Sequence, residues 1–303
     1  MRRGFVLGAL IAVGACSMGV SALQTGGALP QAALDATKIE KVKDNLYIIT
    51  GSSPTNRDAF SGGNTAVFIT SSGVTIVDTK LAGWGQVILD KIKTVTNKPV
   101  TRIINTHTHG DHTGSNGFFG TTVDIVAQEN TAANMAKMDA FKGENAKFLP
   151  KKTFKDRLTL GSGADTIELY YFGRGHTNGD TWVVFPALRV MHTGDMFAWK
   201  DAPTLDPNNG GSGVEYAATI GKALATVKNV DTLIVGHSPL RTVPELREYQ
   251  QFMTDFVAAV RAAKTAGKTV DEAAASIDLS AKYKGYEHQR YTAAVQVIYN
   301  ELH

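Results

Sequence analysis

Residues 105–116, NTHTHGDHTGSN, constrain the fold of this chain more than any other segment. Three of the chain's eight histidines and one aspartate fall within six positions there: His107, His109, Asp111 and His112. The segment follows an apolar, strand-like run at 100–106. Neutral imidazole and carboxylate are the usual ligands of zinc and related divalent ions, and four such groups are costly to bury without a metal. The cluster therefore predicts a metal site at the end of a strand.

The order of the residues allows this loop to serve two metal ions. In an extended chain, side chains two residues apart point to the same side, so His107 and His109 face one point. Gly110 allows the chain to turn, which directs Asp111 and His112 to a second point nearby. The loop therefore supplies part of two ligand sets, and both sets need further ligands from elsewhere in the chain.

Three more candidate ligands each follow an apolar segment. They are His176 after 166–173, Asp195 after 188–194 and His237 after 232–236. Each lies where a predicted strand gives way to a turn flanked by glycine, which is where α/β proteins gather their active sites. These three residues supply the ligands that the histidine loop lacks.

The rest of the chain alternates between predicted strands and helices. Apolar runs rich in Val, Ile and Thr also predict strands at 46–50, 65–70, 73–79, 122–128 and 181–186. Helical spacing predicts helices at 83–95, at 214–228, along an apolar stripe from Leu246 to Val260, after a capping box at 269–272, and at 291–302. Substrate choice is expected to depend on the loops at 51–63, 135–155 and 198–213.

The first 22 residues have the form of a secretory signal peptide. Arg2 and Arg3 precede a short apolar run, and small residues around Ala22 offer a cleavage site. A membrane anchor is the alternative, and a lipid attached to Cys16 is a variant of the export prediction. Residues 23–40 are then predicted to form a flexible leader, and 41–303 a single domain with a helical C-terminal part. The mature protein is expected in the periplasm or outside the cell.

Charge and cysteine content limit the possible functions. Residues 1–22 contain two arginines and no acids, so their removal lowers the formal charge from +3 to +1. This small charge argues against a nucleic-acid partner. Cys16 is the only cysteine, so the mature chain has no thiolate ligand, disulfide or cysteine nucleophile. The expected partner is a small-molecule substrate, and the oligomeric state is left open.

The motifs HTHGDH, GRGHTNGD, HTGD and VGHSP, in this order, resemble those of the metallo-β-lactamase superfamily. The resemblance covers nearly all of the mature chain. It implies an αββα four-layer sandwich of two mixed sheets with outer helices, and a metal site at one edge between the sheets. It also implies that Asp78, in the run TIVDT, is a buried acid that braces the histidine loop.

The resemblance further implies how the ligands are shared. Two zinc ions per chain are expected, with iron or manganese as alternatives, and Asp111 and Asp195 are the expected catalytic residues. One ion would be held by His107, His109 and His176, the second by Asp111, His112 and His237, with Asp195 bridging the two. Two ions that share a carboxylate also share a water, whose pKa falls from 15.7 to about 7, so hydroxide is present at neutral pH.

The residue at position 195 separates branches of this superfamily. Zinc β-lactamases with a cysteine ligand have Cys there, whereas glyoxalase II and the acyl-homoserine lactonases have a bridging aspartate. The resemblance therefore implies an exported hydrolase that cleaves an ester or amide bond of a small molecule, such as a lactone or a β-lactam. The alternatives are an iron-dependent persulfide dioxygenase, a phosphodiesterase or nuclease, and a metal-binding protein without activity.

Several other residues carry weaker expectations. His192 is predicted to pack beside the ligands, and His288 and His303 to lie on the surface. Trp199 and Phe60 are candidates for contact with the substrate. Lys80 and Lys200 are candidates for binding a substrate carboxylate, although an exposed position is the more usual one for lysine.

Overall fold

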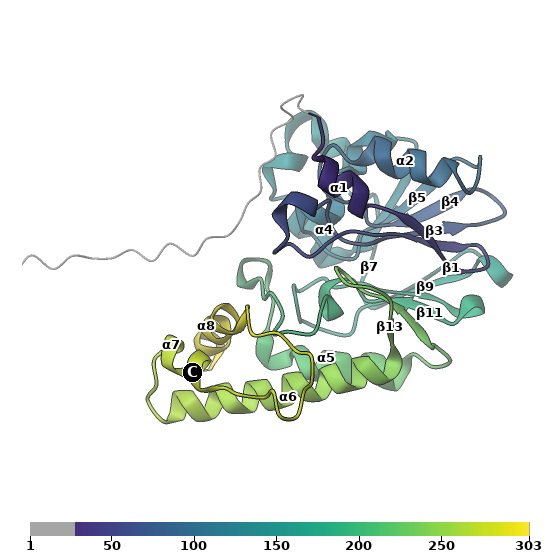
Figure 1. Ribbon diagram of the computed structural model, residues 1–303. Helices are drawn as coiled ribbons and strands as arrows, with labels where there is room; N and C mark the ends of the chain where they lie inside the picture. The colour runs from purple at the N-terminus through teal and green to yellow at the C-terminus, as the bar shows by residue number, and fades with distance from the viewer. Residues whose placement is uncertain (1–27, 303) are drawn as a thin grey trace, which may run out of the picture.

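The computed structural model describes residues 28–302 and consists of two β-sheets packed face to face (Figure 1). The first sheet has the order β1-β2-β3-β4-β5-β6-β7. Its strands are Ile39–Lys43, Leu46–Ile49, Thr65–Ile69, Val74–Val77, Val100–Ile104, Asp124–Gln128 and Lys152–Phe154. The strands pair antiparallel from β1 to β4 and parallel from β4 to β7.

The second sheet is also mixed and has the order β13-β12-β11-β10-β9-β8. Its strands β8 to β13 are Arg157–Leu160, Ile167–Tyr170, Trp182–Phe185, Val190–His192, Thr232–Ile234 and Arg241–Thr242. Only the β11–β12 pair is parallel. Two mixed sheets with helices on their outer faces confirm the predicted αββα sandwich.

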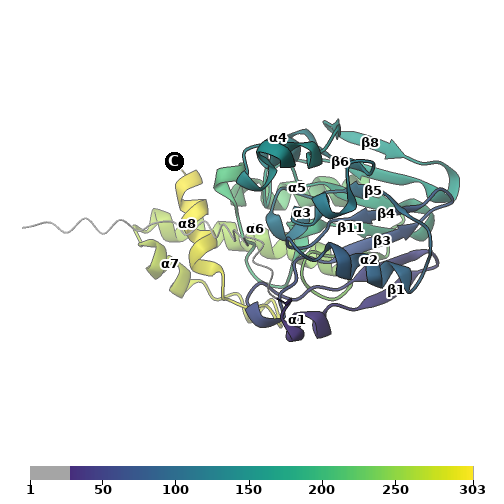
Figure 2. The same cartoon turned by 90° about the horizontal axis from the view of Figure 1, so that it is seen from above.

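Helices cover both outer faces of the sandwich. Helix α2 (Gly85–Lys93) lies over the first sheet, and α5 (Gly213–Thr226) and α6 (Val243–Thr265) lie along the second (Figure 1). Seen from above, α7 (Val270–Ser276) and α8 (Tyr291–Glu301) gather at one end of the sandwich (Figure 2). The remaining helices are α1 (Gln31–Ala36), α3 (Gly110–Thr113) and α4 (Glu129–Met135).

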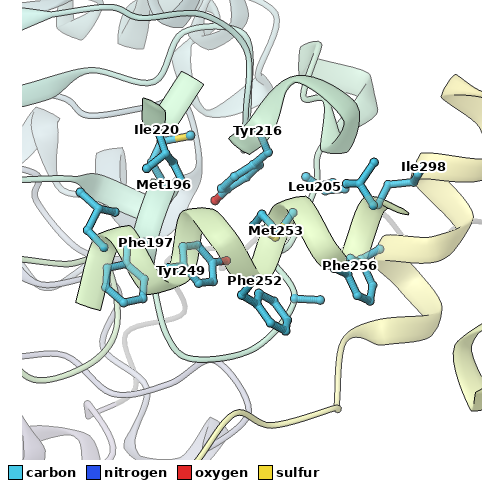
Figure 3. Close-up of a cluster of buried hydrophobic side chains, with 14 of the residues drawn as sticks. Met196, Phe197, Leu205, Tyr216, Ile220, Tyr249, Phe252, Met253, Phe256 and Ile298 are labelled. Carbon is cyan, nitrogen blue, oxygen red and sulfur yellow. The ribbon is translucent and has the colours of Figure 1, made fainter. Parts of the chain in front are cut away.

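Three apolar layers hold these elements together. Phe68 and Phe185 meet between the two sheets, with ring centroids 5.0 Å apart. Ile88 and Ile92 of α2 pack on the outer face of the first sheet. A third, larger cluster joins the second sheet to the C-terminal helices, and an aromatic row along α6 lies at its centre (Figure 3). The predicted strands and helices thus form because each buries one apolar face.

Four strands, β1, β7, β8 and β13, were not predicted. All of them lie at the ends of the two sheets. In β1 the sequence IEKVK leaves every side chain at least partly exposed, and β7 buries only Phe154. Edge strands with few buried residues lack the continuous apolar run that identifies a central strand.

The predicted flexible leader at 23–40 is wrong for its second half. Helix α1 begins at Gln31, and its Ala33 is fully buried. Thr37 is also buried, and its hydroxyl forms hydrogen bonds with the carbonyl oxygen of Ala33 and with the hydroxyl of Ser61. The packed part of the chain therefore begins before residue 40. The predicted signal peptide at 1–22 lies outside the described residues, and within 28–302 no helix has the length and apolarity needed to span a bilayer.

Phe252 tests the contribution of the C-terminal helices to stability. Its ring is fully buried and lies 4.6 Å from the ring of Tyr286, measured between centroids. Phe252→Ala is expected to lower the free energy of unfolding by about 3–5 kcal/mol, measured by urea denaturation. Gln251→Ala, on the exposed side of the same helix, is the control and removes only a surface hydrogen bond to Asp255. Equal effects of the two substitutions would show that the aromatic row is not a stabilising core.

Candidate metal centre

The structure brings all seven predicted ligands to one edge of the sandwich. The histidine loop follows β5, and the other three ligands follow β9, β11 and β12. These residues form three groups, and within each group the potential ligand atoms lie within 4.8 Å of one another. The groups are His107, His109 and His176; His107, His112 and Asp195; and Asp111, His112 and His237. The first and third groups are the two sets that the sequence predicted.

Asp195 lies between the two sets. Its Oδ2 is 3.7 Å from Nε2 of His176 and 3.2 Å from Nε2 of His237, and its Oδ1 is 3.4 Å from Nε2 of His112. Asp111 belongs to the second set, with Oδ2 3.4 Å from Nε2 of His237. These distances suit the predicted bridging position of Asp195, whereas metal binding by the seven side chains stays a prediction.

The residues present fit divalent metal ions. Two inward-facing atoms, Nε2 of His107 and Oδ1 of Asp195, are buried and have no hydrogen-bond partner among the described residues. A metal ion accepts a lone pair from each, which removes the cost of leaving them unpaired. The backbone also leaves room for the ligands: a Cβ at Gly63 would collide with the His112 ring, and one at Gly236 with the Asp195 carboxylate.

Hydrogen bonds on the far side of each ring set the histidine tautomers. His112 Nδ1 donates to Asp78 Oδ2 at 2.7 Å, and His176 Nδ1 donates to the carbonyl oxygen of Thr204 at 2.5 Å. Thr106 Oγ1 donates to Asp78 at 2.7 Å, so it accepts from Nδ1 of His107 at 3.0 Å. In each ring the opposite nitrogen then faces the centre, where it offers a lone pair to a metal ion once it carries no proton.

Asp78 braces the histidine loop as predicted. Besides the two bonds above, its Oδ1 accepts from the backbone N–H of Thr106 at 2.8 Å, and the side chain is fully buried. One carboxylate therefore holds both His107, through Thr106, and His112. This connects the end of β4 to the end of β5.

Asp206 has the same role for His109 and was not predicted. Its Oδ2 accepts from Nε2 of His109 at 2.7 Å, which leaves Nδ1 of His109 free, 2.9 Å from Nε2 of His176. Burial raises the pKa of Asp206, but hydrogen bonds from His109 and Asn209 outweigh this effect and hold the pKa well below its usual value. The run DPNN at 206–209 is typical of a turn, and a carboxylate that begins such a turn in the 198–213 loop was the available signal.

Carboxylates surround His112 and make the electrostatic potential there negative. Burial alone lowers the pKa of this imidazole, but the carboxylates of Asp195, Asp111 and Asp78 outweigh burial and raise it to about 10. By contrast, burial and the neighbouring His112 and His176 hold the pKa of His107 well below its ordinary value. The carboxylates therefore favour a positive charge at the second ligand set, which a metal ion supplies.

The position of Lys80 contradicts both expectations drawn from the sequence. It is fully buried, and its Nζ donates to the carbonyl oxygens of Thr50 and Gly63, each at 2.8 Å. The ammonium group is therefore neither exposed nor available to a substrate carboxylate. Burial lowers the pKa of Lys80 to about 7, although Asp111 and Asp78 act to raise it. Two N–H groups suffice for the two hydrogen bonds, so the neutral amine also fits this position.

The structure also gives the positions of the other residues with weaker expectations. The rings of Phe60 and Trp199 lie 5.7 Å and 5.5 Å from the ring of His237, measured between centroids, so both lie beside the site. His192 is fully buried and accepts from the N–H of Gly194, which confirms that it packs beside the ligands. Lys200 pairs with Glu245 and Glu248 of α6. His288 is exposed, as predicted, and His303 lies outside the described residues.

The sequence profile described as the metallo-beta-lactamase superfamily matches residues 59–237, more than half of the chain. The chain belongs to this superfamily. The metallo-beta-lactamase type 2 of Elizabethkingia meningoseptica is 26% identical over 228 residues, which cover 71% of this chain and 86% of that protein. The chain is therefore a metal-dependent hydrolase.

Solved structures show the same fold. The metallo-beta-lactamase from Pontibacter korlensis aligns with a TM-score of 0.61 and 21% identity, over 72% of this chain and 98% of that one. A double mutant of the sec-alkyl sulfatase PisA1 aligns with a TM-score of 0.70 and 15% identity, over 89% of this chain and 51% of that one. At these identities the likeness extends to the fold alone.

Replacement of Lys80 tests its buried amine. Between pH 7 and 10 the unfolded chain holds the lysine proton and the folded chain does not, so stability rises with pH relative to Lys80→Met. The difference in the free energy of unfolding is expected to change by up to about 1.4 kcal/mol per pH unit, measured by denaturant titration of metal-free protein. Lys98→Met is the control, because this exposed lysine also donates to two carbonyls. If the difference in the free energy of unfolding between Lys80→Met and the unsubstituted protein did not depend on pH, the pKa of Lys80 would not be lowered by burial.

Asp206→Asn tests the support of His109. The amide matches the shape of the carboxylate but is a weaker acceptor. The imidazole of His109 is therefore less firmly oriented and less basic. Zinc affinity of the first ligand set is expected to fall by about 10- to 100-fold, measured by competition with a chromophoric chelator. Asp165→Asn, which alters an exposed carboxylate bonded to Ser71 at a distant turn, is the control. Unchanged zinc affinity in Asp206→Asn would remove this residue from the metal centre.

Proposed function

We propose that the chain is an exported, dinuclear zinc hydrolase that cleaves a carbonyl ester or amide bond of a small molecule. The observation that carries the proposal is the placement of Asp195 within 3.7 Å of nitrogen atoms from both ligand sets. A carboxylate in that position is suited to holding two ions at a short separation. The signal-like first 22 residues support export of the protein.

When bound, two zinc ions supply hydroxide at neutral pH and polarise the carbonyl group that is attacked. The chain's own residues organise the reaction around them. Asp111 combines a position in the second ligand set with a side chain that is 20% exposed, so it can contact both water and substrate. Asp111 orients the attacking water and accepts its proton. The oxygen–carbon bond forms, the bond to the leaving group breaks, and the proton passes to the departing oxygen or nitrogen.

Two observations favour hydrolysis by metal-activated water without a cysteine nucleophile or a cysteine ligand. The only cysteine, Cys16, precedes the described residues, and the position that holds cysteine in one branch of zinc β-lactamases is Asp195 here. The curated relatives are named as metallo-β-lactamases, so a β-lactam also belongs among the candidate substrates. Lactones and β-lactams share a cyclic carbonyl group, and a single site of this kind can attack either.

Metal analysis and a substrate panel test the proposal together. The purified mature protein is expected to contain about two zinc ions per chain and to hydrolyse at least one member of the panel. The panel consists of a chromogenic cephalosporin, an acyl-homoserine lactone, a thioester and a phosphodiester.

Asp195→Ala is expected to lower kcat/KM by at least about 100-fold and to reduce the zinc content. Asp231→Ala, at an exposed carboxylate that pairs with Arg189, is the matched control and should keep both. A single iron ion together with an inert panel would reject the hydrolase and direct the search to sulfur oxidation. Turnover of the phosphodiester alone would replace the carbonyl substrate by a phosphate ester.

A further inference from the structure

The superfamily match ends at residue 237, but the helical C-terminal part of the chain contacts the segment that follows Asp195. The segment before α8 docks on residues 199–202, which follow Asp195. Glu287 N–H donates to the carbonyl oxygen of Lys200 at 2.8 Å, and Gln289 N–H donates to Oδ2 of Asp201 at 3.1 Å. These two hydrogen bonds hold the two segments side by side.

A buried ion pair strengthens this contact. Asp201 is fully buried, and Nη1 of Arg290 lies 3.3 Å from its Oδ2. The other oxygen, Oδ1, accepts from the N–H of Ala202 at 2.7 Å. The carboxylate therefore has partners on both oxygens, and the guanidinium group is held in one orientation.

Arg290 in turn holds Trp199. The guanidinium carbon lies 3.6 Å from the centroid of the indole ring, a close cation–π contact. Trp199 Nε1 donates to the carbonyl oxygen of Ala202 at 3.4 Å. The ring is only half buried and lies 5.5 Å from the ring of His237, so part of it faces the metal centre.

Two aromatic rings lie beside His237, and the two cations of the adjoining segments, Lys200 and Arg290, are paired with carboxylates. Phe60, from the 51–63 loop, is also half buried and lies 5.7 Å from His237. Lys200 lies between Glu245 and Glu248, at 3.4 Å and 3.5 Å, and the charge of Arg290 is balanced by Asp201. Such a surface favours a flat, uncharged group, and neither Lys200 nor Arg290 is available to a substrate carboxylate.

We propose that Trp199, held in place by Arg290 and Asp201, selects substrates that carry a planar, uncharged group next to the scissile bond. The inference rests on the proposed hydrolase function, and it makes the C-terminal helical part a determinant of specificity. Trp199 contacts the substrate, whereas Arg290 and Asp201 are positioning residues that act through it.

Ligand binding tests the inference without turnover. The probes are 4-fluorobenzyl alcohol, 4-fluorobenzoate and trifluoroethanol, observed by fluorine NMR with zinc-loaded and metal-free protein. The alcohol with the ring is expected to bind most tightly to the metal-free protein. Trp199→Leu should weaken its binding by about three- to tenfold and leave trifluoroethanol unchanged.

The positioning role has its own variants. Asp201→Asn combined with Arg290→Met removes both charges and leaves no buried charge unpaired. This double variant should weaken binding of the aromatic alcohol by about two- to fivefold, and it should add little to the effect of Trp199→Leu. Arg157→Met is the matched control, because Arg157 also pairs with a carboxylate and lies over a ring, that of Tyr170, away from the site. Thermal unfolding confirms that each variant is folded.

Turnover of 4-nitrophenyl acetate and its 3-carboxy derivative separates this inference from the hydrolase proposal. The neutral ester should have the higher kcat/KM, and Trp199→Leu should remove that preference mainly through KM. Binding of the aromatic alcohol that depends on Trp199, without hydrolysis of any ester, would reject the hydrolase and keep the aromatic site. Equal binding by Trp199→Leu and the unsubstituted protein, or tighter binding of the benzoate to the metal-free protein, would overturn the inference.

Discussion

The metal centre depends on the buried carboxylate of Asp78. It accepts hydrogen bonds from the backbone and hydroxyl of Thr106 and from the ring of His112, so one residue fixes two predicted ligands and the start of their loop. Its backbone has φ 65°, a conformation that costs a residue other than glycine about 1–3 kcal/mol. The three hydrogen bonds offset this cost. The strain is therefore tolerated where it aims the carboxylate between the ends of β4 and β5.

The same short segment joins the metal loop to the 51–63 loop. Lys80 also has a positive φ, of 60°, and its amine bonds to the carbonyl oxygens of Thr50 and Gly63. Gly63 N–H donates in turn to the carbonyl oxygen of Asp111. A change in the position of this turn would move Asp111, a predicted metal ligand, together with the loop that carries Phe60. Metal binding and the shape of the substrate site are thus mechanically linked through residues that touch neither metal nor substrate.

The predicted ligands were found because each follows an apolar strand, so a local pattern determines their place in the fold. Asp206 escaped prediction because its partner His109 is 97 residues away in the sequence, and no local pattern indicates such a contact. Lys80 was misplaced because a lysine is seldom buried, and the carbonyls that receive its amine belong to another loop. The edge strands were missed because they bury too few side chains to leave an apolar signature.

With the proposed role of Trp199, the chain's chemistry and its selectivity depend on different regions. All seven predicted ligands lie between residues 107 and 237, at strand ends that the two sheets hold rigidly. Arg290 comes from the segment that leads into α8, and α8 packs on α6 through the aromatic cluster, where the rings of Phe256 and Tyr291 are 4.8 Å apart. Repacking of that cluster can shift Arg290, and with it Trp199, without moving a ligand. The helical part can therefore change substrate preference while the metal centre stays intact.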